Sequence, residues 1–291
     1  MAKKKKSQST RIAAIAAIIG VVAVGGAGTA LVLNRQSAGK QEQGAQLATD
    51  AADPQQPADG QDAPVQVDLA GIQLAPDNGM SARAKTLTEH YNSDTLGWIT
   101  VPHTDVDNPI VIGADNEFYL NHGFDHQEFR AGTVFMDFRN KLGFSDDQQS
   151  DNLVLYGHNM KDNTMFGSLR QYRQNLDFYK EAPFIELDTN YQHYTYVIFA
   201  LSIADGRGEA DWRFWDMEDF ADETAFNNFV NPAREKSLVE IPMDVQYGDK
   251  LITLCTCVPD EYETDNSRFL VIGRRLRPGE TTESIMQKLS E

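Results

Sequence analysis

The chain has 291 residues, with 26 Lys or Arg and 43 Asp or Glu, and a formal net charge of −17. Six of the basic residues and no acidic one lie in the first 35, which leaves 20 basic against 43 acidic residues, a net charge of −23 for the rest. Such an acidic balance argues against a nucleic-acid partner, which requires a basic face. Two cysteines are too few for a disulfide framework.

The N-terminal 35 residues combine a basic cluster with an apolar segment. Lys3–Lys6 precede the uncharged run Ile12–Leu33, which Arg35 closes. At about 1.5 Å per residue, such a run is long enough to cross the hydrocarbon core of a bilayer. It predicts a cytoplasmic tail and transmembrane anchor over residues 1–35: a single-pass protein of the cell membrane with the remainder outside the cell. The alternative is a cleaved signal peptide, because small residues around Gly28–Ala30 suit a peptidase.

A change in composition separates two further regions. Residues 36–79 contain no aromatic residue and are dominated by Gln, Ala, Asp, Gly and Pro. Such a segment buries too little apolar surface to offset the entropy of ordering it, so we expect a flexible linker. From Met80 onward, a helical segment (MSARAKTLTEHYN) is followed by strand-like runs bounded by turn residues. We therefore expect one folded domain over residues 80–291.

Eight short runs in this domain are rich in β-branched and aromatic residues. The predicted strands are 97–102, 108–113, 132–138, 152–158, 184–189, 194–204, 250–257 and 268–276. Helical segments are expected at 165–179 and, between the sixth and seventh strands, at 215–237. The pattern predicts a mainly β fold with inserted helices. Its eight strands are expected to form a closed or nearly closed barrel, which leaves few exposed edges.

Both cysteines lie in TLCTC, residues 253–257, at the end of the seventh predicted strand. Because side chains alternate along a strand, Cys255 and Cys257 share a face. Cys257 is the last strand residue before the loop VPDEYETDNS, so a rigid element would hold its thiol beside a loop-lined groove. The alternative is that both thiols are inert core residues.

Two more residues at strand ends suit the chemistry of a cysteine nucleophile. His158 ends the fourth predicted strand, and Arg268 opens the eighth. If the last two strands form an antiparallel hairpin, Cys257 and Arg268 become neighbours at one rim of the barrel. A thiolate, an imidazole that moves protons and a cation that faces developing negative charge meet the needs of acyl transfer. On these residues alone, a surface histidine and an arginine paired with the acidic loop remain alternatives.

Several segments together resemble one known family. TLCTC, followed eleven residues later by the Arg of RFLVIGRRL, resembles the TLxTC…R signature of sortases, the cysteine transpeptidases that attach proteins to Gram-positive cell walls. LVLYGHNM…MFGSLRQY resembles the histidine segment of class B sortases, and DTLGWITVP…NPIVIG…EFYLNHGF…GTVFMDFRN also resembles class B. The likeness runs from about Leu87 to Leu276 and implies an eight-stranded sortase barrel as the catalytic domain.

The resemblance implies a role for each matching residue. Cys257 matches the nucleophile that attacks the carbonyl of a sorting-signal threonine and forms a thioacyl enzyme. His158 matches the acid for the leaving amine and the base for the incoming amine. Arg268 matches the arginine that stabilises the oxyanion or positions the substrate. The expected substrate-binding residues are Thr256, Tyr156 and Asn121.

The resemblance also implies the partners. They are surface proteins that carry a sorting signal and, as acceptor, a peptidoglycan precursor or another cell-wall amine. A pilin lysine as acceptor, an exported Cys–His peptidase and a binding module without turnover remain alternatives. No cofactor and no metal site are expected, since the acidic residues show no ligand spacing. Cys255 stands where class B often has a small polar residue; it is either a size-equivalent replacement or a thiol that modulates Cys257 by transient oxidation.

Overall fold

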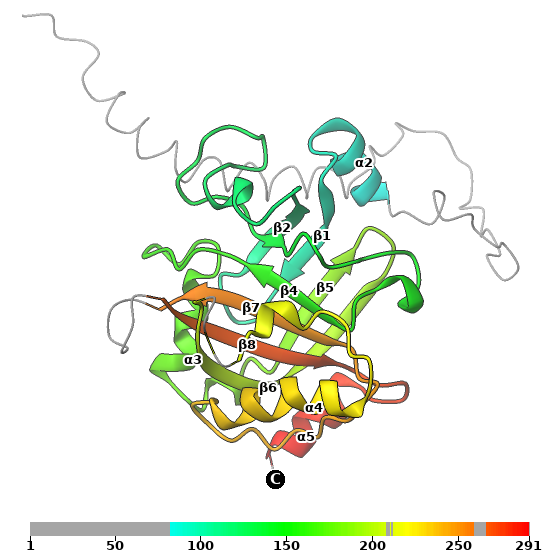
Figure 1. Ribbon diagram of the computed structural model, residues 1–291, viewed down its shortest axis with the longest axis vertical. Coiled ribbons are helices and arrows are strands. Elements are labelled where there is room, and N and C mark those ends of the chain that lie inside the picture. The colour runs from blue at the N-terminus through cyan, green and yellow to red at the C-terminus, as the bar shows by residue number, and fades with distance from the viewer. Residues whose placement is uncertain (1–81, 208–209, 211, 259–265, 291) are drawn as a thin grey trace, which may run out of the picture. The chain divides into compact units, whose positions relative to one another are not determined.

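The fold is a closed barrel with helices on its outside (Figure 1). The computed structural model describes residues 82–207, 210, 212–258 and 266–290. The strands are β1 (Thr95–Thr100), β2 (Asp107–Ile112), β3 (Phe135–Met136), β4 (Asn152–Tyr156), β5 (Phe184–Thr189), β6 (His193–Asp205), β7 (Leu251–Cys257) and β8 (Ser267–Arg275). The α-helices are α2 (Ala82–His90), α3 (Gln171–Gln174), α4 (Glu223–Glu235) and α5 (Thr282–Ser290). Short 3₁₀ helices are η2 (Phe118–Leu120), η3 (Asp146–Gln148), η4 (Gly167–Arg170), η5 (Phe178–Lys180) and η6 (Phe214–Asp216).

The strands follow the order β1-β2-β3-β4-β7-β8-β6-β5, and β5 pairs with β1 to close the barrel. The pairs β2–β3 and β4–β7 are parallel and the others are antiparallel. The predicted eight-stranded barrel is therefore confirmed. The predicted strand at 132–138 shortens to the two residues of β3, because the chain turns directly afterwards, where the Asn140 amide donates to the Asp137 carbonyl at 2.9 Å.

The helices differ from the prediction in detail. The segment expected to be one helix at 165–179 is broken into η4, α3 and η5, since Asn175 adopts an extended conformation directly after α3. The helix expected at 215–237 begins later, where the side chain of Asp222 caps α4 by accepting a hydrogen bond from the amide of Ala225 at 2.8 Å. Through its apolar face, which includes Phe229, α4 packs against the barrel beside β6 (Figure 1).

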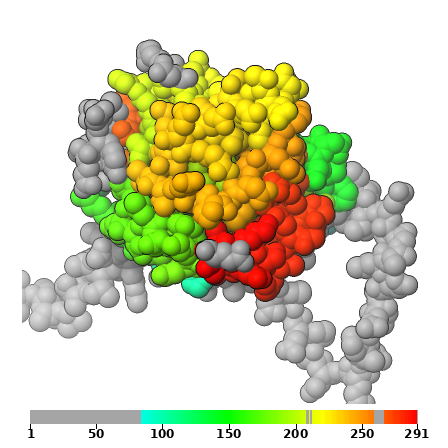
Figure 2. Space-filling model, turned by 90° about the horizontal axis from the view of Figure 1, so that it is seen from below, coloured from blue at the N-terminus to red at the C-terminus, as the bar shows by residue number. Residues whose placement is uncertain are grey.

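A buried ion pair fastens the C-terminal segment to the barrel. Arg274 in β8 is fully buried, and its guanidinium donates to both carboxylate oxygens of Glu280 at 2.6 and 2.8 Å. Its Nε also donates to the carbonyl of Asp244 at 2.8 Å. Figure 2 shows the connection between β6 and β7 and the C-terminal residues side by side over this face of the barrel. A buried charge of this kind is tolerated only because it is paired.

The predicted membrane anchor requires a correction. Its residues, 12–33, and the predicted domain boundaries near residues 35 and 79 lie outside the described residues. Among the helices within residues 82–290, none is long and apolar enough to cross a membrane. The longest, α4, has 13 residues, or about 20 Å of helix against about 30 Å of hydrocarbon. This finding contradicts the predicted single-pass localisation with an extracellular catalytic domain, which is withdrawn.

Candidate active site

The ends of β7 and β8 bring a thiol beside a guanidinium. The two strands are antiparallel and Cys257 lies opposite Arg268, which confirms the predicted hairpin. Cys257 is exposed and Arg268 is half-buried. A Cβ atom added to Gly206, which follows β6, would lie 3.1 and 3.2 Å from Cγ and Cζ of Arg268. The arginine side chain therefore packs against backbone that has no side chain of its own.

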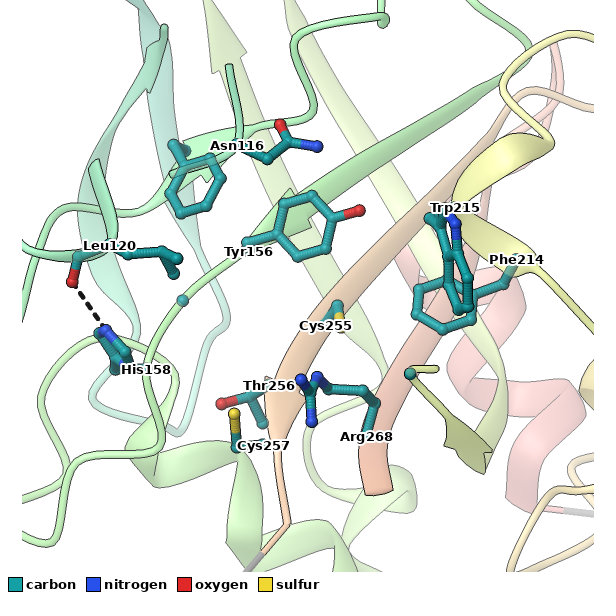
Figure 3. A pocket seen from close by; sticks show the side chains of 13 residues that line it. Asn116, Leu120, Tyr156, His158, Phe214, Trp215, Cys255, Thr256, Cys257 and Arg268 are labelled. Atoms are coloured by element: carbon teal, nitrogen blue, oxygen red, sulfur yellow. Dashed lines mark hydrogen bonds between the residues drawn. The ribbon is translucent and has the colours of Figure 1, made fainter. Parts of the chain in front are cut away.

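A cavity of about 320 Å³ opens at these strand ends (Figure 3). Cys257, His158 and Arg268, which are far apart in the sequence, all line it. Two of the three residues expected to bind substrate, Thr256 and Tyr156, line it as well. The structure thus brings a thiol, an imidazole and a guanidinium to one cavity.

His158 lies in the loop after β4, and a backbone carbonyl fixes the orientation of its ring. Its Nε2 lies 2.8 Å from the carbonyl oxygen of Leu120, and in Figure 3 the ring turns toward that carbonyl. A carbonyl oxygen only accepts, so Nε2 carries the proton in this contact. The neutral imidazole then has its lone pair on Nδ1. The segment that contains η2 therefore selects the tautomer of His158.

Asn159, which sequence reasoning missed, joins the loop of His158 to the end of β7 at Cys257. Its Nδ2 donates to the carbonyl oxygen of Cys257 at 2.9 Å. Its Oδ1 accepts from Arg170 at 3.3 Å, and the same guanidinium donates to the carbonyls of Met160 and Lys161. The residue directly after His158 therefore sets the distance between the loop and β7. Its place beside His158 was the only sequence signal.

The expected substrate residues occupy different positions. Thr256 is buried, and its Oγ1 is a buried atom with no hydrogen-bond partner among the residues that the structure describes. Tyr156 lines the cavity, and its hydroxyl is held by Asp137, to which it donates at 2.9 Å. Asn121 is exposed and does not belong to the described lining of the cavity, whereas its neighbour Leu120 does.

Cys255 also lines the cavity, but its thiol is buried and less reactive than an exposed thiol such as that of Cys257. It is 3% exposed and lies opposite Tyr156 across β4 and β7. Burial raises the pKa of the Cys255 thiol to about 12, although the positive charge of Arg268 acts in the opposite direction. A buried neutral thiol is a poor nucleophile. Both cysteines are free in the structure, and the oxidation hypothesis for Cys255 stays a prediction.

An aromatic wall completes the cavity and was also missed. Phe214 and Trp215 of η6 line it, and their rings meet edge to face with centroids 5.0 Å apart. Trp215 lies in a 3₁₀ turn and not at the start of the helix expected at 215–237; the aromatic cluster WRFW ahead of the cap residue Asp222 was a usable signal. Within the described residues, no group of three or more His, Cys, Asp or Glu side chains is arranged to hold a metal ion.

Comparisons with known proteins decide the family. The sequence model of the sortase domain matches residues 99–276, which include Cys257, His158 and Arg268. The chain belongs to the sortase family.

Sortase B relatives agree with the class B resemblance. Sortase B of Listeria monocytogenes is 33% identical over 184 residues, which are 63% of this chain and 70% of that protein. The crystal structure of Staphylococcus aureus sortase B has a TM-score of 0.59 at 30% identity, and the match covers 68% of this chain and 88% of that one. A structure of sortase B complexed with triglycine has a TM-score of 0.58 at 29% identity, with 67% and 86% covered. This sortase is therefore a cysteine transpeptidase of class B.

Proposed function

We propose that this sortase cleaves a C-terminal sorting motif after threonine and transfers the acyl group to an amine of cell-wall peptidoglycan. The observation that carries the proposal is the cavity shared by Cys257, His158 and Arg268, in which the first and last are cross-strand neighbours. The sortase B structure complexed with triglycine supports a glycine-type amine as acceptor.

In the acylation step, the Cys257 thiolate attacks the threonine carbonyl carbon and a C–S bond forms. The negative charge that develops on the carbonyl oxygen faces Arg268, whose guanidinium is always charged and offers several donors. As the tetrahedral species collapses, the C–N bond breaks and protonated His158 gives a proton to the leaving amine. The threonine is left as a thioester on Cys257.

In the transfer step, an acceptor amine gives a proton to neutral His158 and attacks the thioester carbonyl. The C–S bond breaks, the new amide forms and Cys257 leaves as the thiolate. The hydrogen bond from His158 to Leu120 leaves one ring nitrogen with a lone pair for this proton transfer. The enzyme thus returns to its starting protonation state.

The cavity offers a peptide both apolar and polar contacts. The rings of Phe214, Trp215 and Tyr156 form apolar surface, and burial together with the neighbouring Asp137 charge raises the pKa of Tyr156, so its ring stays neutral. The half-buried guanidinium of Arg268 offers hydrogen-bond donors beside the nucleophile. A few fixed polar groups in an apolar cleft are typical of specific ligand sites.

Product analysis with a sorting-motif peptide tests the proposal. We expect wild-type protein to join the peptide, cut after threonine, to added triglycine, and we expect Cys257→Ala to give neither cleavage nor transfer. If added triglycine leaves hydrolysis as the sole reaction, the protein is a Cys–His peptidase and the transfer step is wrong. If Cys257→Ala keeps cleaving, the assigned nucleophile is wrong.

A further inference from the structure

A buried carboxylate outside the cavity accepts hydrogen bonds from residues in two of the cavity's walls. Asp137, directly after β3, is fully buried. Its Oδ1 accepts from the backbone amide and the Nε of Arg139 at 3.0 and 2.8 Å. Its Oδ2 accepts from Arg139 Nη2 at 2.8 Å, from the Tyr156 hydroxyl at 2.9 Å and from Asn116 Nδ2 at 2.9 Å. Tyr156 and Asn116 both line the cavity, one from β4 and the other from the connection between β2 and β3.

The guanidinium of Arg139 also donates hydrogen bonds to a third wall of the cavity. Arg139 Nη1 donates to Asp216 Oδ1 at 2.5 Å, and Nη2 donates to the carbonyl oxygen of Trp215 at 2.5 Å. Its Nε also lies 3.5 Å from a carboxylate oxygen of Glu218. Trp215 and Asp216 belong to η6, and Figure 3 shows Phe214 and Trp215 on the side of the cavity away from His158. Arg139 therefore ties the connection between β6 and β7 to the end of β3.

We propose that Asp137 and Arg139 form a positioning pair that holds three walls of the groove in the shape that a sorting-signal peptide requires. This inference rests on the proposed function. Among the described lining residues of the cavity, neither Asp137 nor Arg139 appears, so the pair acts through Asn116, Tyr156 and Trp215. A groove held in its binding shape before the ligand arrives loses less entropy when the ligand binds.

The ionisation of the pair agrees with this role. Burial acts to raise the pKa of Asp137, but hydrogen bonds from Arg139, Tyr156 and Asn116 outweigh it and hold the pKa below its usual value. The carboxylate thus stays charged and keeps accepting all of these bonds. Removing one partner of a buried pair leaves the other charge uncompensated, which destabilises the fold. The decisive variant must therefore keep the positive charge at position 139 and remove the planar guanidinium group.

Arg139→Lys is that variant. A lysine ammonium can neutralise Asp137, but as a compact point charge it lacks the planar fork that bonds both oxygens of Asp137 together with Asp216 and the Trp215 carbonyl. We expect the fold to survive and η6 to lose its attachment. The groove then binds peptide less well while the chemistry at Cys257 is unaffected.

The matched control is Arg277→Lys. Arg277 binds the buried carboxylate of Asp249 through Nε and Nη2 at 2.8 Å each and also bonds Asp244, so it repeats the contacts of Arg139. It follows β8, at the end of the β7–β8 hairpin away from the Cys257–Arg268 pair. Both arginines are about a quarter exposed. If the loss of a guanidinium that binds a buried carboxylate had a general effect on the protein, that effect would appear equally in the two variants.

The test measures kcat and KM with a sorting-signal peptide, and the rate at which iodoacetamide alkylates Cys257. For Arg139→Lys we expect KM to rise about tenfold, with kcat and the alkylation rate within about twofold of wild type. A higher KM at unchanged kcat is expected when substrate and transition state are bound equally less well. For Arg277→Lys we expect wild-type KM at a similar loss of thermal stability. An unchanged KM in Arg139→Lys, or an equal rise in both variants, would overturn the inference.

Backbone hydrogen exchange separates failure of this inference from failure of the proposed function. If the wild-type protein turns over no sorting-signal peptide, the proposed function fails, yet exchange at residues 214–218 still reports the attachment of η6. Faster exchange there in Arg139→Lys but not in Arg277→Lys supports the positioning pair. Equal exchange in the two variants contradicts it, whatever the substrate.

Discussion

Replacement of Asn159 by alanine is expected to impair catalysis far more than stability. The substitution removes the 2.9 Å hydrogen bond to the carbonyl of Cys257 and the 3.3 Å contact with Arg170. Arg170 keeps its bonds to the carbonyls of Met160 and Lys161, so no charge is left without partners. The loss of stability is then that of one or two hydrogen bonds, about 1–2 kcal/mol, which lowers Tm by roughly 2–8 °C in a domain of this size.

The catalytic effect follows from where that hydrogen bond lies. Asn159 is adjacent to His158, so the substitution frees the proton carrier to move relative to the nucleophile. Displacements of about 1 Å in a catalytic group cost up to about 100-fold in rate. We therefore expect kcat for peptide transfer to fall about 10- to 100-fold. The rate of Cys257 alkylation by iodoacetamide, which needs no proton carrier, should stay within about twofold of wild type.

Asn190→Ala is the matched control for this substitution. Asn190 Nδ2 donates to the carbonyl oxygen of Thr95 at 2.8 Å, again a side-chain amide on a barrel-strand carbonyl, but away from the cavity. Thermal unfolding and steady-state kinetics of both variants would be compared. If kcat of Asn159→Ala equals that of Asn190→Ala at a similar loss of Tm, the positioning role of Asn159 is refuted.

Three further predictions concern the buried thiol of Cys255, the Arg274–Glu280 ion pair (the C-terminal clamp) and the contact of Gly206 with Arg268. Burial raises the pKa of Cys255 from about 9 in the unfolded chain to about 12 in the folded protein. The unfolded chain therefore releases this proton first, and the folded protein loses stability as the pH rises from 9 to 12. In thermal melts over that range, Cys255→Ala should lose less stability than wild type. Glu280→Gln leaves the buried Arg274 poorly paired and should destabilise by about 3 kcal/mol, measured by denaturant unfolding; a loss below about 1 kcal/mol would contradict the clamp. Gly206→Ala places a methyl 3.0 Å from the backbone oxygen of Asn266 and 3.1 Å from Cγ of Arg268, and should lower kcat several-fold. Unaltered kinetics would show that the arginine tolerates displacement.

The strands and the main site residues were predictable from local sequence because each depends on a short-range pattern. Alternation and turn residues located the strands, and the last two predicted strands already paired Cys257 with Arg268, as the structure has them. His158 was also noted at a strand end, but its approach to the same cavity depends on the parallel pairing of β4 with β7. No local pattern encodes that pairing, because its partners are about a hundred residues apart in the chain.

The features that the sequence did not reveal depend on contacts between distant segments. The break in the segment 165–179 and the late start of α4 reflect Asn175 and the cap at Asp222. The hydrogen bond from Asn159 to Cys257 and the bonds from Arg139 to η6 join residues 98 and 76–77 positions apart. Their side chains carry no motif of their own. Substrate residues were the weakest prediction, since Asn121 points to solvent while its neighbour Leu120 lines the cavity.

The most direct test of the central claim is to locate the covalent intermediate. Wild-type protein would be mixed briefly with a library of sorting-motif peptides, quenched in acid and mapped by mass spectrometry. The account predicts a threonine-ended acyl group on Cys257, an unmodified Cys255, and slower adduct formation in Arg268→Lys. An acyl group on Cys255, or turnover with no acyl group on either cysteine, would contradict it.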